Sequence, residues 1–103
     1  MSTREISAES LEYVKVWVDA HRSGVSFDPT GDVVEMAFTT GPNIEEADWQ
    51  EGSWETIGRK HYARCLVGPS GTIELDEGSY QVWVRITDNP EIPVLKAGNV
   101  KVI

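Results

Sequence analysis

The chain is built of short runs in which apolar and polar residues alternate, separated by turn sequences rich in glycine and proline. Between Leu11 and Ala20, for example, Val14, Val16 and Val18 occupy every second position. Alternation with a period of two is typical of a strand that turns one face to the core and the other to solvent. Because the strand pattern recurs along the chain and hardly any helix is expected, the sequence predicts an all-β domain.

Six further strands are predicted, between turns in which proline fixes φ and glycine supplies unusual backbone conformations. The second strand should direct Val34, Met36 and Phe38 to the core, with Ala37 on the opposite face. The predicted strands are Val33–Thr39, Trp54–Ile57, Lys60–Val67, Thr72–Leu75, Ser79–Thr87 and Ile92–Ile103, the last interrupted by Gly98. The main turns are Asp28–Asp32, Gly41–Asn43, Gly68–Gly71 and Asp88–Glu91.

A chain of 103 residues has room for one core, and we expect a single domain over residues 11–103. Residues 1–10 are polar and have no periodicity, which predicts a flexible N-terminal arm. Residues 43–53 leave two interpretations open. The stretch Ile44–Trp49 is either one helical turn after an Asn43 cap or part of a loop.

The net charge of −8 would repel phosphate backbones and anionic membranes, so neither nucleic acid nor a membrane is an expected partner. Cys65 is the only cysteine, which excludes an intrachain disulfide and is compatible with assembly in a reducing cytoplasm. We also expect no signal peptide and no membrane-spanning segment, since no apolar run is long enough.

A sharp corner is predicted between Leu75 and Val82, where Gly78 permits a tight turn and Tyr80 can bury its ring. The Asp76, Gly78 and Tyr80 spacing resembles the Asp-x-Gly-x-Tyr-x-Cys corner of immunoglobulin domains, with Val82 in the position of the second cysteine. The resemblance implies an immunoglobulin-like β-sandwich of about seven antiparallel strands without a disulfide. In that arrangement Trp54 or Tyr62 is a candidate for the core aromatic residue of strand C.

Catalytic and metal-binding patterns are poorly represented. His61 and Cys65 would lie about 13 Å apart on one strand, too far for a nucleophile and its base. His21 is remote in the sequence from both residues. A calcium site would need the carboxylates of Asp28, Asp32, Asp76 and Glu77 to converge, but turn chemistry already explains these residues. We therefore expect no enzyme activity, no cofactor and no metal.

Large aromatic residues occupy strand positions that face away from the predicted core. Tyr13 and Trp17 alternate with charged residues, and Trp83 is followed two positions later by Arg85. Tyr, Trp and Arg dominate the energetics of protein interfaces, so these four residues are the candidate interface. The alternative is that a loop, such as the one containing Trp49, folds over them.

Three segments carry a further resemblance: Gly52–Thr56, His61–Pro69 and Val82–Val94. Over residues 11–103 the chain resembles small virion-associated proteins of tailed bacteriophages that infect actinobacteria. It is also similar to immunoglobulin-like modules of phage tail and baseplate proteins. The resemblance implies a non-catalytic structural protein of the virion, assembled in the host cytoplasm, on the capsid surface, at the head-to-tail connector or in the tail.

Such a protein would bind other virion proteins, with many copies in each particle, because repeated weak contacts gain strength through effective concentration. The alternative function is an adhesion or carbohydrate-binding module, for which Trp17 and Trp83 would be stacking platforms.

Overall fold

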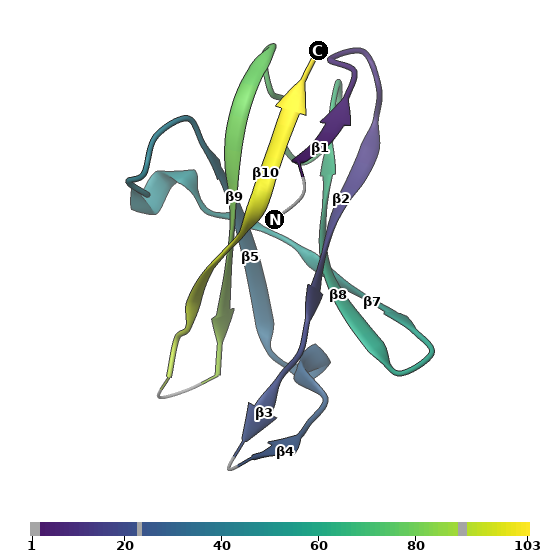
Figure 1. Ribbon diagram of the computed structural model, residues 1–103, viewed down its shortest axis with the longest axis vertical. Helices are drawn as coiled ribbons and strands as arrows, with labels where there is room; N and C mark the ends of the chain where they lie inside the picture. The colour runs from purple at the N-terminus through teal and green to yellow at the C-terminus, as the bar shows by residue number, and fades with distance from the viewer. Residues whose placement is uncertain (1–2, 23, 89–90) are drawn as a thin grey trace.

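A computed structural model (Figure 1) describes residues 3–22, 24–88 and 91–103. The strands of the two main sheets are β1 (Thr3–Ile6), β2 (Glu12–Val18), β5 (Val33–Thr39), β6 (Gln50–Glu51), β7 (Ser53–Ile57), β8 (Lys60–Val67), β9 (Gly78–Thr87) and β10 (Val94–Val102). A small hairpin of β3 (His21–Arg22) and β4 (Val25–Ser26) extends from the end of β2. The short 3₁₀ turns are η1 (Pro29–Gly31) and η2 (Glu46–Asp48).

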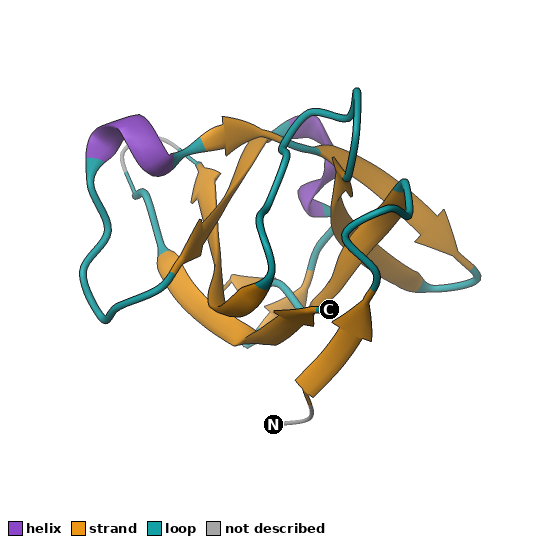
Figure 2. Ribbon diagram, turned by 90° about the horizontal axis from the view of Figure 1, so that it is seen from above, coloured by secondary structure: helices purple, strands orange, loops and turns teal. Residues whose placement is uncertain are grey.

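The strands form two sheets that pack against each other as a β-sandwich, and the all-β prediction is confirmed. One sheet has the order β1-β10-β9-β5-β6 and the other the order β2-β8-β7. Figure 2 shows the strands on both sides of the interior. Among the described strands, only β1 and β10 pair in parallel. No helix in the described part of the chain is long and apolar enough to cross a membrane.

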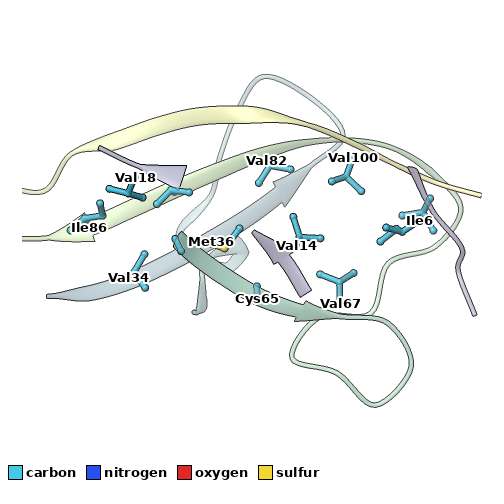
Figure 3. Packing of buried hydrophobic residues seen from close by; sticks show 13 residues of the cluster. Ile6, Val14, Val18, Val34, Met36, Cys65, Val67, Val82, Ile86 and Val100 are labelled. Atoms are coloured by element: carbon cyan, nitrogen blue, oxygen red, sulfur yellow. The ribbon is translucent and has the colours of Figure 1, made fainter. Parts of the chain in front are cut away.

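The core fills the space between the sheets with the residues that the alternation predicted (Figure 3). Val14 and Val18 of β2 and Met36 of β5 are buried, and Met36 is 0% exposed. Ala37 is also 0% exposed, although the alternation assigned it to the solvent side. Ala37 lies opposite Trp83, and the loop that carries Glu46 and Trp49 packs on Arg85 on the same face of the sheet.

The N-terminal segment is part of the sandwich, so the prediction of a flexible arm over residues 1–10 is wrong for the residues that the structure describes. Residues Thr3–Ile6 pair with Asn99–Val102, and Ile6 is 4% exposed. The pairing continues as Ile103 N donates to Ile6 O at 2.9 Å and Ala8 N donates to Ile103 O at 2.8 Å. The strand that pairs with β1 lies at the other end of the chain, so no local sequence pattern indicates this pairing. Met1 and Ser2 lie outside the described residues.

Several local predictions are refined. The segment Thr72–Leu75 forms only an isolated bridge between Ile73 and Val67 in place of a full strand. The helical-turn alternative holds at η2, where Glu45 rather than Asn43 is the cap and its N–H donates to Asp48 Oδ2 at 2.8 Å. In the predicted turn Asp88–Glu91, the two end residues exchange backbone hydrogen bonds, while Asn89 and Pro90 lie outside the described residues.

A hydrogen bond closes the predicted corner. Tyr80 Oη donates to the carbonyl oxygen of Asp76 at 2.8 Å, and the Tyr80 ring packs against the core. Gly78 has φ of 153°, a conformation that side chains rarely adopt, so a glycine is favoured where the chain enters β9. The corner therefore fixes the passage of the chain from one sheet to the other.

Candidate functional site

The four candidate interface residues lie on opposite sides of the sandwich. Tyr13 and Trp17 belong to β2 in the three-stranded sheet, whereas Trp83 and Arg85 belong to β9 in the five-stranded sheet. All four point away from the core, as the alternation predicted, because their neighbours Val14, Val18, Val82 and Val84 are buried. They cannot form one continuous surface, and the two pairs have different environments.

Arg85 is held in a clamp within the protein. Its guanidinium donates to both oxygens of Glu35 at 3.0 Å and to both oxygens of Glu46 at 3.0 and 3.1 Å. Its Cζ lies 4.6 Å from the centre of the Trp49 ring. These carboxylates raise the pKa of Arg85, and Arg85 in turn lowers the pKa of Glu46. With 17% of its side chain exposed, Arg85 anchors the loop of η2 to the sheet.

Trp83 is half-buried on the same face. Its Nε1–H donates to the hydroxyl oxygen of Thr39 at 2.9 Å, and its neighbour across the strands is the fully buried Ala37. The alternative in which the Trp49 loop covers the outward residues is thus confirmed for Arg85, and Trp83 has an internal hydrogen-bond partner. Tyr13 and Trp17 remain as the exposed members of the predicted set.

The outer side of the three-stranded sheet carries a ladder of rings and charges on three adjacent strands. Trp17 lies directly opposite Tyr62, and Lys15 lies opposite Arg64. Trp17 is 55% exposed and Tyr13 is 37% exposed. We call this surface the aromatic–cationic face, defined by Tyr13, Lys15, Trp17, Glu55, Lys60, Tyr62 and Arg64.

Cations stack on the two exposed rings of the aromatic–cationic face. Arg64 Cζ lies 4.2 Å from the centre of the Tyr13 ring, and Lys60 Nζ lies 5.0 Å from the centre of the Trp17 ring. Such contacts place a cation over the electron-rich ring face and restrict the motion of both side chains. Each of the two exposed rings therefore has an internal cation as a stacking partner.

A single carboxylate, Glu55, lies among three cations on this face. Lys15 Nζ donates to Glu55 Oε1 at 2.9 Å, and Arg64 donates to Glu55 Oε2 at 2.7 Å. These bonds lower the pKa of Glu55, with Lys15 as the largest cause. The seven residues of the face therefore carry three cations and one carboxylate, while Glu51 lies beside Tyr13 and Arg64 at its border. The interface predicted from the sequence did not include Lys60, Tyr62 and Arg64, although these residues alternate along β8 as its outward positions.

The titratable residues considered for catalysis are separated. Cys65 is 2% exposed, and burial raises the pKa of its thiol to about 11, which keeps it protonated at neutral pH. His61 Nδ1 lies 2.9 Å from Thr56 Oγ1, and His61 Nε2 lies 3.8 Å from Asp28 Oδ1. His21 is paired with Asp19 at 2.9 Å.

The carboxylates considered for calcium do not converge. Asp28 accepts hydrogen bonds from the backbone and the hydroxyl of Thr30, as expected for a turn aspartate. Asp32 lines a cleft beside the β3–β4 hairpin, whereas Asp76 and Glu77 line a hollow beside Pro69 at the other end of the sandwich. No group of three potential ligands lies together in the described part of the chain.

Comparison with protein-family models, characterised proteins and solved structures finds no match to this chain. The functional argument therefore depends on the residues and on their geometry.

Proposed function

We propose that the sandwich is immunoglobulin-like. The order of strands in each sheet supports this proposal: β2, β8 and β7 correspond to strands B, E and D, and β10, β9, β5 and β6 to G, F, C and C′. The Tyr80–Asp76 hydrogen bond supports it as well, because it lies where the chain passes from E to F. In this arrangement Met36 is the core residue of strand C, so neither Trp54 on β7 nor Tyr62 on β8 has the place proposed for it.

For the function, we propose a non-catalytic structural protein of a bacteriophage virion, in the head or head-to-tail region. The observation that carries the proposal is the aromatic–cationic face, which presents two exposed rings, each with a cation stacked on it, on one side of a sheet. Its composition of Trp, Tyr and Arg is typical of residues that dominate protein interfaces. The partners are other virion proteins.

Purified particles from a phage that encodes the chain test this proposal. We expect quantitative mass spectrometry to find the protein in many copies per particle, and Trp17→Ala to reduce its incorporation. Val33→Ala is the matched control, because Val33 is 57% exposed, close to the 55% of Trp17, but lies on β5 in the other sheet. Absence of the protein from mature particles would refute the virion role.

A second candidate is an adhesion or carbohydrate-binding module of the tail or baseplate, favoured by the exposed ring of Trp17 as a stacking surface. Trp83 is less suited to that task because it is half-buried and its Nε1–H is already bonded to Thr39. Glycan-array binding that is lost in Trp17→Ala and retained in Trp83→Phe would favour this second function. Absence of glycan binding by the unaltered protein would remove it.

A further inference from the structure

One edge of the five-stranded sheet is only partly covered. β1 is the edge strand, and it pairs with Asn99–Val102 of β10, which leaves the first half of β10 without a neighbour on that side. Figure 1 shows β1 beside the C-terminal half of β10, while the N-terminal half of β10 continues past it. A sheet edge of this kind offers unpaired backbone groups to another strand.

The direction of the free backbone groups follows from the ladder between β9 and β10. Ile86 N donates to Pro93 O at 3.1 Å, so the backbone of Pro93 points toward β9. Backbone direction alternates along a strand, and the N–H and C=O groups of Val94 and Lys96 therefore point away from β9. Neither residue has another backbone partner in the described ranges.

Leu95 lies between these two residues and has an unusual environment. It is paired across the strands with Val84, which is 0% exposed, so its side chain lies on the core face of the sheet. Nevertheless, Leu95 is 51% exposed. A leucine on the core face that remains half-exposed indicates that the interior is uncovered at this point.

Leu95 borders a cleft of about 270 Å³ that opens between the two sheets at the end carrying the β3–β4 hairpin. Its apolar lining comes from both sheets and the loops between them: Val18, Ala20, Phe27, Pro29, Ile86 and Pro93. The unpaired edge of β10 and the apolar cleft are therefore adjacent, which is the combination that strand addition uses: backbone bonds for affinity and a pocket for alternate side chains.

The charged residues of the cleft are almost all acidic. Asp32 and Glu91 line it together with Asp88 and Asp19, and Asp19 is paired at 2.9 Å with His21, the one basic side chain among the described lining residues. An acidic rim favours a ligand with lysine or arginine beside its apolar residues and disfavours an acidic one.

We propose that the first half of β10 is a docking site for an extended, basic segment of a partner protein, which adds as a strand beside Val94–Lys96 and inserts an apolar side chain against Leu95. The site is distinct from the aromatic–cationic face. It does not depend on the virion role, because any partner with such a segment satisfies it.

The experiment uses the full chain and two synthetic peptides, the basic Lys-Val-Thr-Val-Arg-Val-Lys and its acidic counterpart Glu-Val-Thr-Val-Glu-Val-Glu. We expect the basic peptide to bind in a fluorescence anisotropy titration, and we expect its affinity to fall as salt is added. The amide protons of Val94 and Lys96 should become protected from hydrogen exchange when it binds. The acidic peptide should bind at least about tenfold more weakly.

Leu95→Asp should weaken binding about tenfold or more, since it places a charge in the apolar contact. Leu11→Asp is the matched control: Leu11 is 50% exposed, lies outside the cleft, and should leave binding unchanged. An unaltered thermal transition of Leu95→Asp separates loss of binding from loss of folding; should that variant not fold, the amide protection of Val94 and Lys96 decides alone.

The proposal would be overturned by no binding of the basic peptide at millimolar concentration, by binding in which Val94 and Lys96 remain unprotected, or by equal affinity for the acidic peptide. Self-association that protects both amides without peptide would overturn it as well, because the occupant would then be a second copy of this chain.

Discussion

The clamp around Arg85 leads to a quantitative prediction about stability. Arg85→Gln removes both bonds to Glu35, both bonds to Glu46 and the cation that stacks on Trp49. Only 23% of the Glu35 side chain is exposed, and Arg85 is its described ion-pair partner, so the variant leaves a half-buried carboxylate without a counter-charge. We expect the free energy of unfolding to fall by about 1–2 kcal/mol, above the ~0.2–1 of an exposed pair and below the ~3–5 of a fully buried one.

Urea titration and thermal unfolding measure this loss. For a domain of this size, 1 kcal/mol corresponds to about 4–8 °C in Tm, so the transition should move down by roughly 5–15 °C. The double variant Glu35→Gln/Arg85→Gln should recover part of the loss, because no charge is then left unpaired.

Arg64→Gln on the opposite sheet is the matched control. It removes an equivalent arginine whose partner Glu55 keeps a second cation, Lys15, at 2.9 Å. The control should therefore lose less stability than Arg85→Gln. If both variants lose the same amount, or if Arg85→Gln unfolds at the temperature of the unaltered protein, the clamp does not have the structural role argued for it.

Three other variants test separate parts of the structure. Tyr80→Phe should lower the free energy of unfolding in urea by about 1 kcal/mol, since it removes the hydrogen bond to Asp76. The hydroxyl of Tyr62 donates to no described residue, so Tyr62→Phe should leave the free energy of unfolding unchanged. Burial raises the pKa of the Cys65 thiol from 9.0 to about 11, because the folded protein disfavours the charged thiolate. The free energy of unfolding should therefore be constant below pH 9 and fall as the pH rises toward 11. Cys65→Ala should make this fall less steep. Trp17→Ala should leave Tm nearly unchanged, whereas Trp83→Ala should lower it clearly; equal effects would contradict the different burial of the two rings.

The strands that carry their own alternation were predictable from the sequence. In β2, β5 and β9 the core side is marked at every second position by Val14, Val16 and Val18, by Val34 and Met36, and by Val82 and Val84, whereas Val33 of β5 lies on the outward side. The corner was predictable too, because Gly78 and Tyr80 act over a few residues. Burial of Cys65 in the core follows the same rule of alternation along β8.

Pairing between distant segments was not predictable. Among residues 4–6 of β1, whose burial is described, only Ile6 is in the core, too few for a pattern, and its partner Val102 lies at the other end of the chain. The exposure of Leu95 was not predictable either, because its sequence neighbours are those of an ordinary core residue. Its exposure results from the cleft that opens between the two sheets at this point.

Which outward residues remain exposed was decided by the tertiary structure alone. Alternation assigns Trp17 and Arg85 equally to the outer side of their strands. Only the loop that carries Glu46 and Trp49 distinguishes them, because it folds over the five-stranded sheet and has no counterpart among the described residues over the rings of the three-stranded sheet. A local period determines the face of a strand on which a side chain lies, whereas nonlocal contacts determine what covers that face.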